Sequence, residues 1–365
     1  MNGVWGKLLQ ISIFGESHAP AIGVVIHGLP SGFRPDMDEV RRHMARRAPG
    51  KNALSTPRAE ADEVEVLSGM VDGVTTGTPL CAMIRNTNTR SGDYEALRHT
   101  VRPGHSDYGY YVKSGGYNDV RGGGHASGRL TAPLVFCGSL CRQLLAKYGI
   151  EVGAHVRSIA GIEDRAFDTV IDPNTLRELT YAEVPLLHKE LETSMTQAIL
   201  QAREQGDSVG GSIEFAVSGV PAGVGEPFFD SVESTLSHLL FSVPAVKAVA
   251  FGDGFGLCEM RGSQANDPWE IRNGQVVTRT NRNGGVLGGI TTGMPIVATV
   301  AIKPTPSIFQ EQDSIDPITN QPCKLKLQGR HDPCIVLRAV PVIESVAAIG
   351  IYDLLLQANS QKERK

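Results

Sequence analysis

The sequence predicts an α+β fold, organised as one domain of two similar halves, and two observations support that prediction. Short apolar runs typical of strands alternate with segments of helical spacing. In addition, two turn motifs recur in the same order. The GLPSGF stretch that begins at Gly28 resembles the GVPAGV stretch at Gly219, and GVTTGTP at Gly73 resembles GITTGMP at Gly289. Two motif pairs in the same order indicate an internal repeat.

The repeat is expected to cover residues 22–86 in its first copy and residues 211–303 in its second copy. Each copy would be a strand–turn–helix–strand–strand unit, with a longer insert in the second. A coincidental match between turn-rich segments is the alternative. The chain has no Ser/Gly-rich or Pro-rich linker and no low-complexity tract. We therefore expect a single domain over residues 1–365, with a solvated tail over residues 359–365.

The expected elements follow in chain order. Segments with helical spacing are residues 36–47 and 229–243, and the strand-like runs are LLQISIF (8–14), IGVVIH (22–27), SIEFAVS (212–218) and IVATVAI (296–302). Residues 126–149 are apolar on most faces and indicate a buried helix, while residues 184–205 indicate an amphipathic helix that Gly206 ends. Residues 336–359 indicate another long apolar helix, with Pro341 as a kink or a break.

The composition limits the classes of protein to consider. Hydrophobic residues make up 41% and charged residues 20%, which is ordinary for a soluble protein. A net charge of -4, only 6% aromatic residues and no basic stripe argue against nucleic acid or an anionic membrane as a partner. No apolar run reaches the roughly 18 residues expected of a membrane helix. The six cysteines lack a CxxC pair, which favours reduced thiols, no metal site and a cytoplasmic location.

Two long segments, residues 86–124 and 303–333, lack a regular pattern and are rich in Gly, Asp, Arg, Pro and Thr. Loops of that length in a compact chain are usually functional or disordered. The mixture of glycine, histidine and arginine in them favours a functional role.

Two histidines are candidate acid–base groups. His18 lies in the FGESH turn after the first strand, and His105 lies in RPGHSDY, between Arg102 and Asp107. Those two neighbours could shift the pKa of His105 in opposite directions. Histidine titrates near neutral pH, so His18 and His105 could act as general acids in one site, although a solvated turn or loop histidine is the alternative for each. The GESHA turn lacks the last glycine of a GxSxG nucleophile elbow, which disfavours a hydrolase.

The glycine-rich stretch RGGGHASGR, from Arg121 to Arg129, is expected to open the apolar helix. Consecutive glycines there would expose backbone N–H groups at the positive end of the helix dipole and form a cradle for an anion such as phosphate. The stretch fits neither a Walker loop nor GxGxxG. A flexible glycine hinge is the alternative.

Cationic residues recur near these glycine turns. Lys303 follows the last strand-like run, and Arg330 and Asp332 precede the C-terminal helix. Asp332 could simply cap that helix, and the pair Arg46-Arg47 could complement the dipole of the first helix. Together with the histidines, the cations indicate a cytosolic enzyme that binds a polyanionic small molecule. Composition and spacing do not indicate the reaction.

These stretches resemble the signatures of the chorismate synthase family. FGESH with GVVIHGLPSG resembles its N-terminal signature, RPGHSDY its histidine loop, RGGGHASGR its glycine–serine–arginine stretch, and GRHDPCIVLRAVPVIE its C-terminal signature. Between them, LSGMVDGVTTGTP, GDSVGG, SGVPAGVGEP, FGDGF, RGSQAND, NGGVLGGITTGMP and KPTPSI match in the same order. The resemblance covers roughly residues 3–358.

The resemblance implies a carbon–oxygen lyase of the shikimate pathway. Its reaction would be the anti-1,4-elimination of phosphate from 5-enolpyruvylshikimate 3-phosphate to give chorismate, the last common step towards the aromatic amino acids. Reduced FMN would be required without net redox change, with NADPH as one candidate reductant and a separate flavin reductase as another. The resemblance also implies a β-α-β sandwich of two pseudo-symmetric halves around long central helices, assembled as a homotetramer.

Roles for the acidic groups follow from the same resemblance. His18 and His105 would be the family's acidic histidines, one serving the leaving phosphate and the other the reduced flavin. Asp332, with help from the hydroxyl of Ser17 or Ser127, would assist proton removal at the flavin. The alternative is a flavin- or nucleotide-binding relative without this activity, but such a protein would not need the histidine and aspartate set.

The ligand-binding residues are also implied by the matching motifs. Arg47 would hold an anionic ligand, either the substrate or NADP, and Arg129 would face the substrate. The flavin contacts would be His125, Ala126, Ser127, Pro244, Ala245, Gly288, Lys303, Pro304, Thr305, Pro306, Ser307 and Arg330.

Two positions depart from the family pattern. Many relatives have an arginine six residues after Arg47, where this chain has Ala53, and Lys51 or Arg58 are candidate substitutes. The usual glycine–serine–arginine stretch is nearer RGGGRSSAR, so the contact at His125 is expected to be weaker at high pH.

Overall fold

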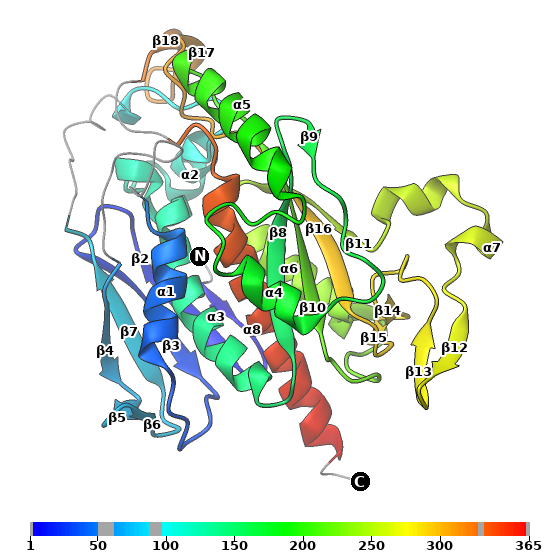
Figure 1. Ribbon diagram of the computed structural model, residues 1–365. Helices are drawn as coiled ribbons and strands as arrows, with labels where there is room; N and C mark the ends of the chain where they lie inside the picture. Colours follow the sequence, from blue (N-terminus) through cyan, green and yellow to red (C-terminus); the bar gives the residue numbers. More distant parts are fainter. Residues whose placement is uncertain (1–2, 50–61, 88–96, 328–331, 363–365) are drawn as a thin grey trace.

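The computed structural model of the chain describes residues 3–49, 62–87, 97–327 and 332–362. Two five-stranded sheets lie on either side of a layer of helices, and the strand pairs within them are antiparallel (Figure 1). The predicted α+β sandwich with long central helices is therefore confirmed.

The strands are arranged in two sheets and several hairpins. The first sheet has the order β1 (Val4–Trp5), β2 (Gln10–Gly15), β3 (Ala21–His27), β7 (Leu80–Arg85) and β4 (Val64–Ser68). The second sheet has the order β9 (Ile162–Glu163), β8 (Glu151–Ile159), β10 (Gly211–Ser218), β16 (Ile296–Ile302) and β11 (Val246–Phe251). The hairpins are β5 (Met70–Val71) with β6 (Val74–Thr75), β12 (Trp269–Arg272) with β13 (Gln275–Thr278), β14 (Val286–Leu287) with β15 (Ile290–Thr291), and β17 (Gln312–Asp316) with β18 (Gln321–Leu325).

The layer between the sheets contains α1 (Met37–Arg47), α3 (Thr131–Ala146), α6 (Val232–Ser242) and α8 (Val336–Lys362). Helix α3 contacts β3 and β7 of the first sheet, α8 contacts β8 and β10 of the second, and the two helices contact each other. The shorter helices α2 (Asp107–Ser114), α4 (Pro173–Leu179), α5 (Glu192–Glu204) and α7 (Gly262–Ala265) lie around this layer (Figure 1).

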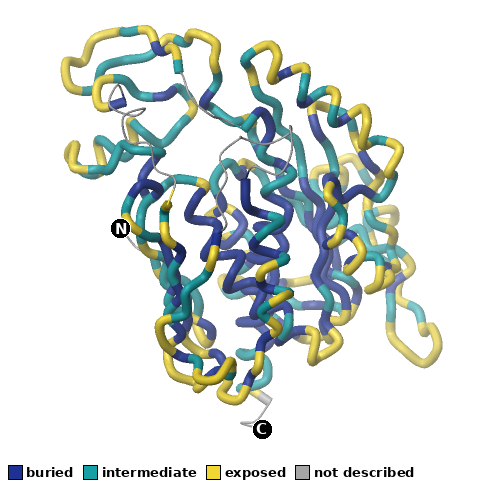
Figure 2. The backbone as a smooth tube through the Cα atoms, turned by 60° about the vertical axis from the view of Figure 1, so that its left-hand side comes forward, coloured by how far each residue is buried: buried dark blue, intermediate teal, exposed yellow. Residues whose placement is uncertain are grey.

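Burial on all sides explains the apolar sequences of α3 and α8. Figure 2 shows the buried backbone concentrated in the middle of the molecule, which is where a helix that is apolar all round belongs. Within Val336–Gln361 of α8, the most apolar window of 18 residues has a mean hydropathy of 1.8, so the helix is long and apolar enough to span a membrane, contrary to the expectation from the sequence. However, 94% of its most apolar window is buried within the protein, so α8 is a core helix. It continues through Pro341 without a break.

Two predicted helices begin later than expected. The helix predicted over residues 126–149 begins at Thr131. The helix predicted over residues 184–205 begins at Glu192, because the N–H groups of two preceding residues donate to the carboxylate of Asp164 instead. Before α3, residues Gly128–Leu130 form a 3-10 turn instead, and before α5 tertiary hydrogen bonds override the local helical pattern.

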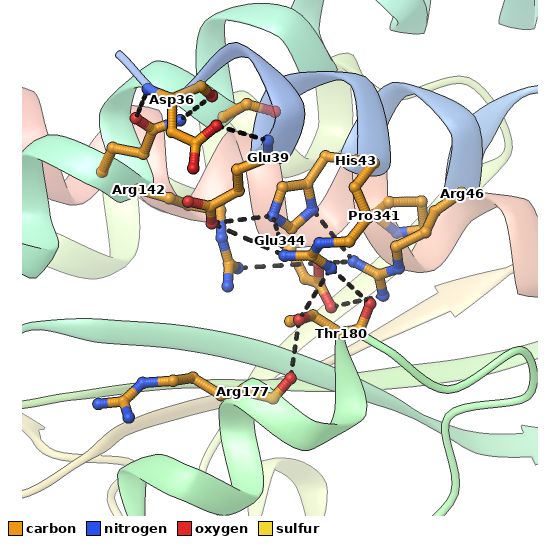
Figure 3. A network of polar contacts seen from close by, with 12 residues as sticks. Asp36, Glu39, His43, Arg46, Arg142, Arg177, Thr180, Pro341 and Glu344 are labelled. Atoms are coloured by element: carbon orange, nitrogen blue, oxygen red, sulfur yellow. Dashed lines mark hydrogen bonds and ion pairs between the residues drawn. The ribbon is translucent and has the colours of Figure 1, made fainter. Parts of the chain in front are cut away.

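Buried carboxylates fix α8 within the layer. Asp353 accepts hydrogen bonds from the main-chain N–H groups of Leu8 and Leu9, at 2.8 and 2.7 Å. Earlier in α8, Glu344 accepts two hydrogen bonds from Arg46 of α1 (Figure 3). A buried charge is costly unless it is paired and hydrogen-bonded. These contacts therefore set the position of α8 relative to α1 and the start of the first sheet.

The two sheets repeat one topology. The order β2-β3-β7-β4 in the first sheet corresponds to β8-β10-β16-β11 in the second. Thr75 and Thr291, from the GVTTG and GITTG motifs, donate to the carbonyls of Pro30 and Pro221, both at 2.6 Å. Each hydroxyl also accepts a hydrogen bond from a main-chain N–H of the same turn. That residues 22–86 and 211–303 arose by duplication, and that the chain is one domain, stay predictions.

We expect Thr75→Val and Thr291→Val to destabilise the protein by similar amounts. Both hydroxyls are buried, so their removal leaves a carbonyl and an N–H without a partner, at a cost of about 1–3 kcal/mol. The free energy of unfolding in urea would be compared with that of the exposed control Thr78→Val, which should stay within about 0.5 kcal/mol of wild type. A clear loss at only one of the two positions would contradict their structural equivalence.

Candidate active site

The turn between β2 and β3 buries two of the predicted residues. Ser17 is 2% exposed and His18 is 7% exposed, although both lie in a polar stretch of sequence. The main-chain N–H of Ser17 donates to the carbonyl of Gly124 at 3.1 Å. This bond joins the His18 turn to the glycine segment, residues 122–124.

The glycine segment lies between the two predicted histidines. Its residues have φ values of 60°, 86° and 56°, in the left-handed region that favours glycine. A Cβ atom on Gly122 would lie 2.5 Å from Cε1 of His18, and a Cβ atom on Gly123 would lie 3.0 Å from Cε1 of His105. A side chain at either position would therefore clash with an imidazole ring. His18 and His105 flank the same short stretch of backbone.

The glycines do not form the start of α3. That helix begins at Thr131, and the three glycines have non-helical backbone angles. The prediction that their N–H groups lie at the positive end of the helix dipole is therefore wrong. Their conformation instead lets the backbone pass between two imidazole rings.

A carboxylate orients His105. Nδ1 of His105 lies 2.6 Å from Oδ1 of Asp107, and Arg102 holds the same carboxylate with side-chain hydrogen bonds of 2.7 and 2.8 Å. Burial would raise the pKa of Asp107, but the hydrogen bonds from Arg102 and His105 outweigh it and lower that pKa. An ionised Asp107 keeps a proton on Nδ1. The other nitrogen, Nε2, faces the glycine segment, 3.2 Å from the position of a Cβ on Gly123.

Arg47 and Arg129 share one buried carboxylate, that of Asp62. Nη1 of Arg47 lies 2.7 Å from Oδ2 of Asp62, and Arg129 contacts Oδ1. Arg47 also donates to Oγ1 of Thr131 and to the carbonyl of Gly128, both at 3.2 Å. Burial would raise the pKa of Asp62, but the two guanidinium groups lower it. Burial lowers the pKa of Arg47 to about 10, which leaves it protonated at neutral pH, so the three groups carry one net positive charge.

The sequence analysis missed Asp62. It is one of 39 acidic residues, and no motif distinguishes it from the others. Only its burial between two arginines, with a φ of 50° that is uncommon outside glycine, marks it as special. Ala53 and its candidate substitutes Lys51 and Arg58 lie outside the described residues.

The loop that follows β16 contacts the His105 loop. Nζ of Lys303 donates to the carbonyl of Gly104, and Arg102 donates to Oγ of Ser307 at 3.4 Å. The main-chain N–H of Lys303 donates to the carbonyl of Ala245 at 3.0 Å. Two groups of predicted flavin-binding residues are therefore joined to the His105 loop: Pro244 with Ala245, and Lys303, Pro304, Thr305, Pro306 and Ser307.

His125 and Ser127 have separate contacts on either side of Ala126. Nδ1 of His125 lies 2.7 Å from the carbonyl of Gly15, at the end of β2. Oγ of Ser127 accepts a hydrogen bond of 3.3 Å from the main-chain N–H of Arg129. Ser127 thus caps the short turn that carries Arg129, and the stretch connects the His18 turn with the arginine pair.

The remaining predicted residues lie elsewhere. Asp332 pairs with Arg338 at 2.5 Å, and Arg338 donates to the carbonyl of Arg47, so Asp332 is joined to the arginine side of the site. Gly288 lies in the β14–β15 turn before β16, at the opposite end of that strand from the loop that contacts His105. At roughly 3.3 Å per strand residue, the two ends of β16 are about 20 Å apart. Arg330 lies outside the described residues.

Imidazole rings, buried guanidinium groups and a lysine are therefore connected at the ends of β2, β7 and β16. Such a set can donate protons while it binds an anion. Among the described residues, no group of three or more His, Cys, Asp or Glu side chains is arranged to hold a metal ion. The fold and the site define an α+β sandwich enzyme for an anionic small molecule.

Comparisons with known proteins agree over the whole length. The family model described as chorismate synthase matches residues 9–356. A chorismate synthase of Thermococcus gammatolerans is 46% identical over 352 residues, 96% of this chain and 97% of that protein. One of Methanosarcina acetivorans is 40% identical over 359 residues, 98% of this chain and 97% of that protein. A crystal structure of chorismate synthase has a TM-score of 0.76 at 26% identity, and the match covers 99% of this chain and 98% of that one. The chain belongs to the chorismate synthase family, whose members are lyases that form chorismate.

Replacing Asp107 by Asn should change both stability and turnover. The folded pKa of Asp107 lies below the unfolded value near 3.9, so its ionised form stabilises the protein above about pH 4, and this contribution is lost as the pH falls further. The free energies of unfolding of wild type and Asp107→Asn should therefore differ most at neutral pH and converge in acid. Because the proton on Nδ1 of His105 is no longer fixed, kcat should fall at least about 10-fold.

The exposed Asp168, which pairs with Arg165, provides the control for this experiment. Asp168→Asn should keep the wild-type kcat and show little change in stability at any pH. Identical behaviour of the two variants would contradict the assigned role of Asp107.

Proposed function

We propose that the chain catalyses the anti-1,4-elimination of phosphate from 5-enolpyruvylshikimate 3-phosphate, with reduced FMN as its cofactor. In this reaction the allylic C–O bond to phosphate breaks, a C–H bond breaks at the far end of the allylic system, and a diene forms without net redox change. The observation that carries the proposal is the placement of His18 and His105 on either side of one glycine segment. Loss of an anionic leaving group needs a proton donor beside it.

The surroundings of His105 suit a proton donor at a fixed atom. Asp107 keeps one proton on Nδ1, so a protonated His105 would donate from Nε2, which faces the glycine segment. His18, on the other side of Gly122, would supply the second proton. One histidine would donate a proton to the phosphate oxygen as the C–O bond breaks. The other would act as the proton donor to the anionic cofactor, as the family resemblance implies.

Arg47 and Arg129 are the candidates for binding the carboxylates and the phosphate of the substrate. Asp62 lies between the two guanidinium groups, and all three side chains are almost fully buried. A guanidinium in a site from which water is excluded binds an anion more strongly than it does in water. The same placement would exclude water from the reacting carbon atoms.

The loop after β16 fits a flavin. Oγ1 of Thr305 is buried and has no hydrogen-bond partner among the described residues, so it can bond to a ligand. Burial, and then the charge of Lys247, lowers the pKa of Lys303, as expected for a cation held without an anion. Gly104 packs directly against this loop, because a Cβ on it would lie 3.4 Å from Cβ of Pro306 and 3.6 Å from Nζ of Lys303. When bound, reduced flavin would supply electron density to the allylic system of the substrate.

We assign the flavin contacts to the same residues as the family motifs do. Asp332, with Ser17 or Ser127, would take part in proton removal at the flavin. Gly288 lies at the far end of β16, so it would reach the flavin from a second copy of the chain. The proposed contacts are His125, Ala126, Ser127, Pro244, Ala245, Gly288, Lys303, Pro304, Thr305, Pro306, Ser307 and Arg330.

The proposal extends to assembly and location. A contribution of Gly288 from a second copy supports the homotetramer implied by the family. We propose a cytoplasmic enzyme, in agreement with the absence of a CxxC pair from the sequence and the burial of α8. FMN would be reduced either by NADPH on this enzyme or by a separate flavin reductase.

An anaerobic assay tests the reaction directly. The protein is mixed with 5-enolpyruvylshikimate 3-phosphate and FMN, with and without dithionite, and phosphate release is followed together with the diene absorbance of chorismate. We expect both products only with reduced flavin. Tight FMN binding without product under reduction would instead indicate a flavin-binding relative that lacks the activity.

Alanine variants test the acid roles. We expect His18→Ala and His105→Ala each to lower kcat by about 100- to 10,000-fold, because each removes a positioned proton donor. His238→Ala, an exposed position on α6, is the matched control and should keep the wild-type kcat. Full turnover in either of the first two variants would remove that histidine from the mechanism.

A further inference from the structure

Asn86 directly follows β7 and faces the turn that carries His18. Its Nδ2 atom donates to the carbonyl of Glu16 at 3.1 Å and to the carbonyl of Ala19 at 2.7 Å. Its main-chain N–H donates to the carbonyl of Pro20, also at 3.1 Å. One residue from a neighbouring strand end therefore holds three carbonyl groups of the turn, on both sides of His18.

The orientation of the Asn86 amide is fixed from the other side. Its Oδ1 atom accepts a hydrogen bond of 3.1 Å from Nε of Arg129. A guanidinium group only donates and a carbonyl only accepts, so one orientation of the amide makes all of these bonds. Arg129 is itself held by Asp62, which also holds Arg47. A continuous set of contacts thus connects the arginine pair to the His18 turn.

We propose that Asn86 is a positioning residue for His18. Without its amide, the half-buried carbonyls of Glu16 and Ala19 would lose the donor that holds them, and the turn would shift to find other partners. The space around His18 tolerates little movement, since a Cβ on Gly122 would already lie 2.5 Å from the ring. A small shift of the turn would therefore change the direction in which His18 donates a proton. This inference rests on the proposed function, in which His18 is an acid.

Two substitutions separate the two bonds that the side chain makes. Asn86→Ala removes both the donor to the turn and the acceptor for Arg129. Asn86→Asp keeps an acceptor for Arg129 and replaces the donor to the turn by a charged oxygen that repels the carbonyls of Glu16 and Ala19. If the amide acts on His18, both variants should show the same defect. If it acts only on Arg129, Asn86→Asp should behave like wild type.

Asn281 provides a matched control. Its Nδ2 atom donates to the carbonyl of Pro295 at 2.8 Å, in the second half of the chain, so Asn281→Ala also removes an amide that holds a backbone carbonyl. We expect it to lose stability without loss of turnover. Thermal unfolding of all three variants shows how far each is destabilised.

Amide hydrogen exchange, measured without substrate or flavin, reports how readily the turn that carries His18 opens. We expect the peptide that covers residues 15–20 to exchange at least about 10-fold faster in Asn86→Ala and Asn86→Asp, because opening of the turn requires less free energy. The same peptide should exchange at the wild-type rate in Asn281→Ala. Unchanged exchange in Asn86→Asp would overturn the proposal.

Steady-state kinetics with 5-enolpyruvylshikimate 3-phosphate and reduced FMN show whether loss of the Asn86 amide impairs proton donation by His18. We expect kcat of both Asn86 variants to fall about 10- to 100-fold, with a change in KM of less than about 3-fold, because proton donation follows binding. Asn281→Ala should keep the wild-type kcat. Wild-type kcat in Asn86→Asp, with a loss of thermal stability like that of Asn281→Ala, would identify a purely structural role and overturn the proposal.

Failure of the proposed function can be distinguished from failure of the proposal for Asn86. If the wild-type protein releases no phosphate, the proposed function is wrong, while the exchange experiment still decides whether Asn86 holds the turn. If Asn86→Ala does not fold, Asn86→Asp still decides the proposal, because it keeps the bond to Arg129.

Discussion

The two sheets share one layer of helices. This shared layer determines where the strand ends, and with them the candidate site, lie. Each five-stranded sheet has an apolar face that must be covered, and the pair α3 and α8 covers both faces at once. Strand ends from the two halves therefore come to lie at the same border of the layer. The His18 turn comes from the first half and the Lys303 loop from the second, so neither half contains a complete site.

Charge within the layer is compensated in two different ways. Arg46 and Arg142 lie beside the carboxylate of Glu344, at 2.5 and 3.7 Å, while Arg47 and Arg129 share the carboxylate of Asp62. The first arrangement holds helices together. The second brings two guanidinium groups together at one buried carboxylate.

The neighbouring His43 shows why burial of a histidine is not sufficient for an acid role. It lies among the arginines that surround Glu344 (Figure 3). Burial, and then the charge of Arg142, lowers the pKa of His43 to about 2, so its ring is neutral near pH 7. At the candidate site, by contrast, Nδ1 of His105 lies 2.6 Å from a carboxylate oxygen of Asp107.

Sequence patterns were informative where the local backbone decides the structure. The turn glycines and threonines indicated the repeated topology, and the helical spacing indicated α1, α6 and α8. The start of α5 could not be predicted, because hydrogen bonds to the distant residue Asp164 decide it. Asp62 and Asn86 were missed for the same reason: each is an ordinary polar residue in sequence, and its role follows only from partners that the fold brings to it.

The bonds between Asp353 and the N–H groups of Leu8 and Leu9 join residues that are 345 and 344 positions apart. A nascent chain on the ribosome cannot make them until α8 has emerged, and until then the second sheet lacks the helix that contacts β8 and β10. Such a high contact order makes folding slow and leaves apolar surface open to chaperones and to aggregation in the meantime. The contacts that join the start of the first sheet to α8 therefore form only after residues 336–362 have been synthesised.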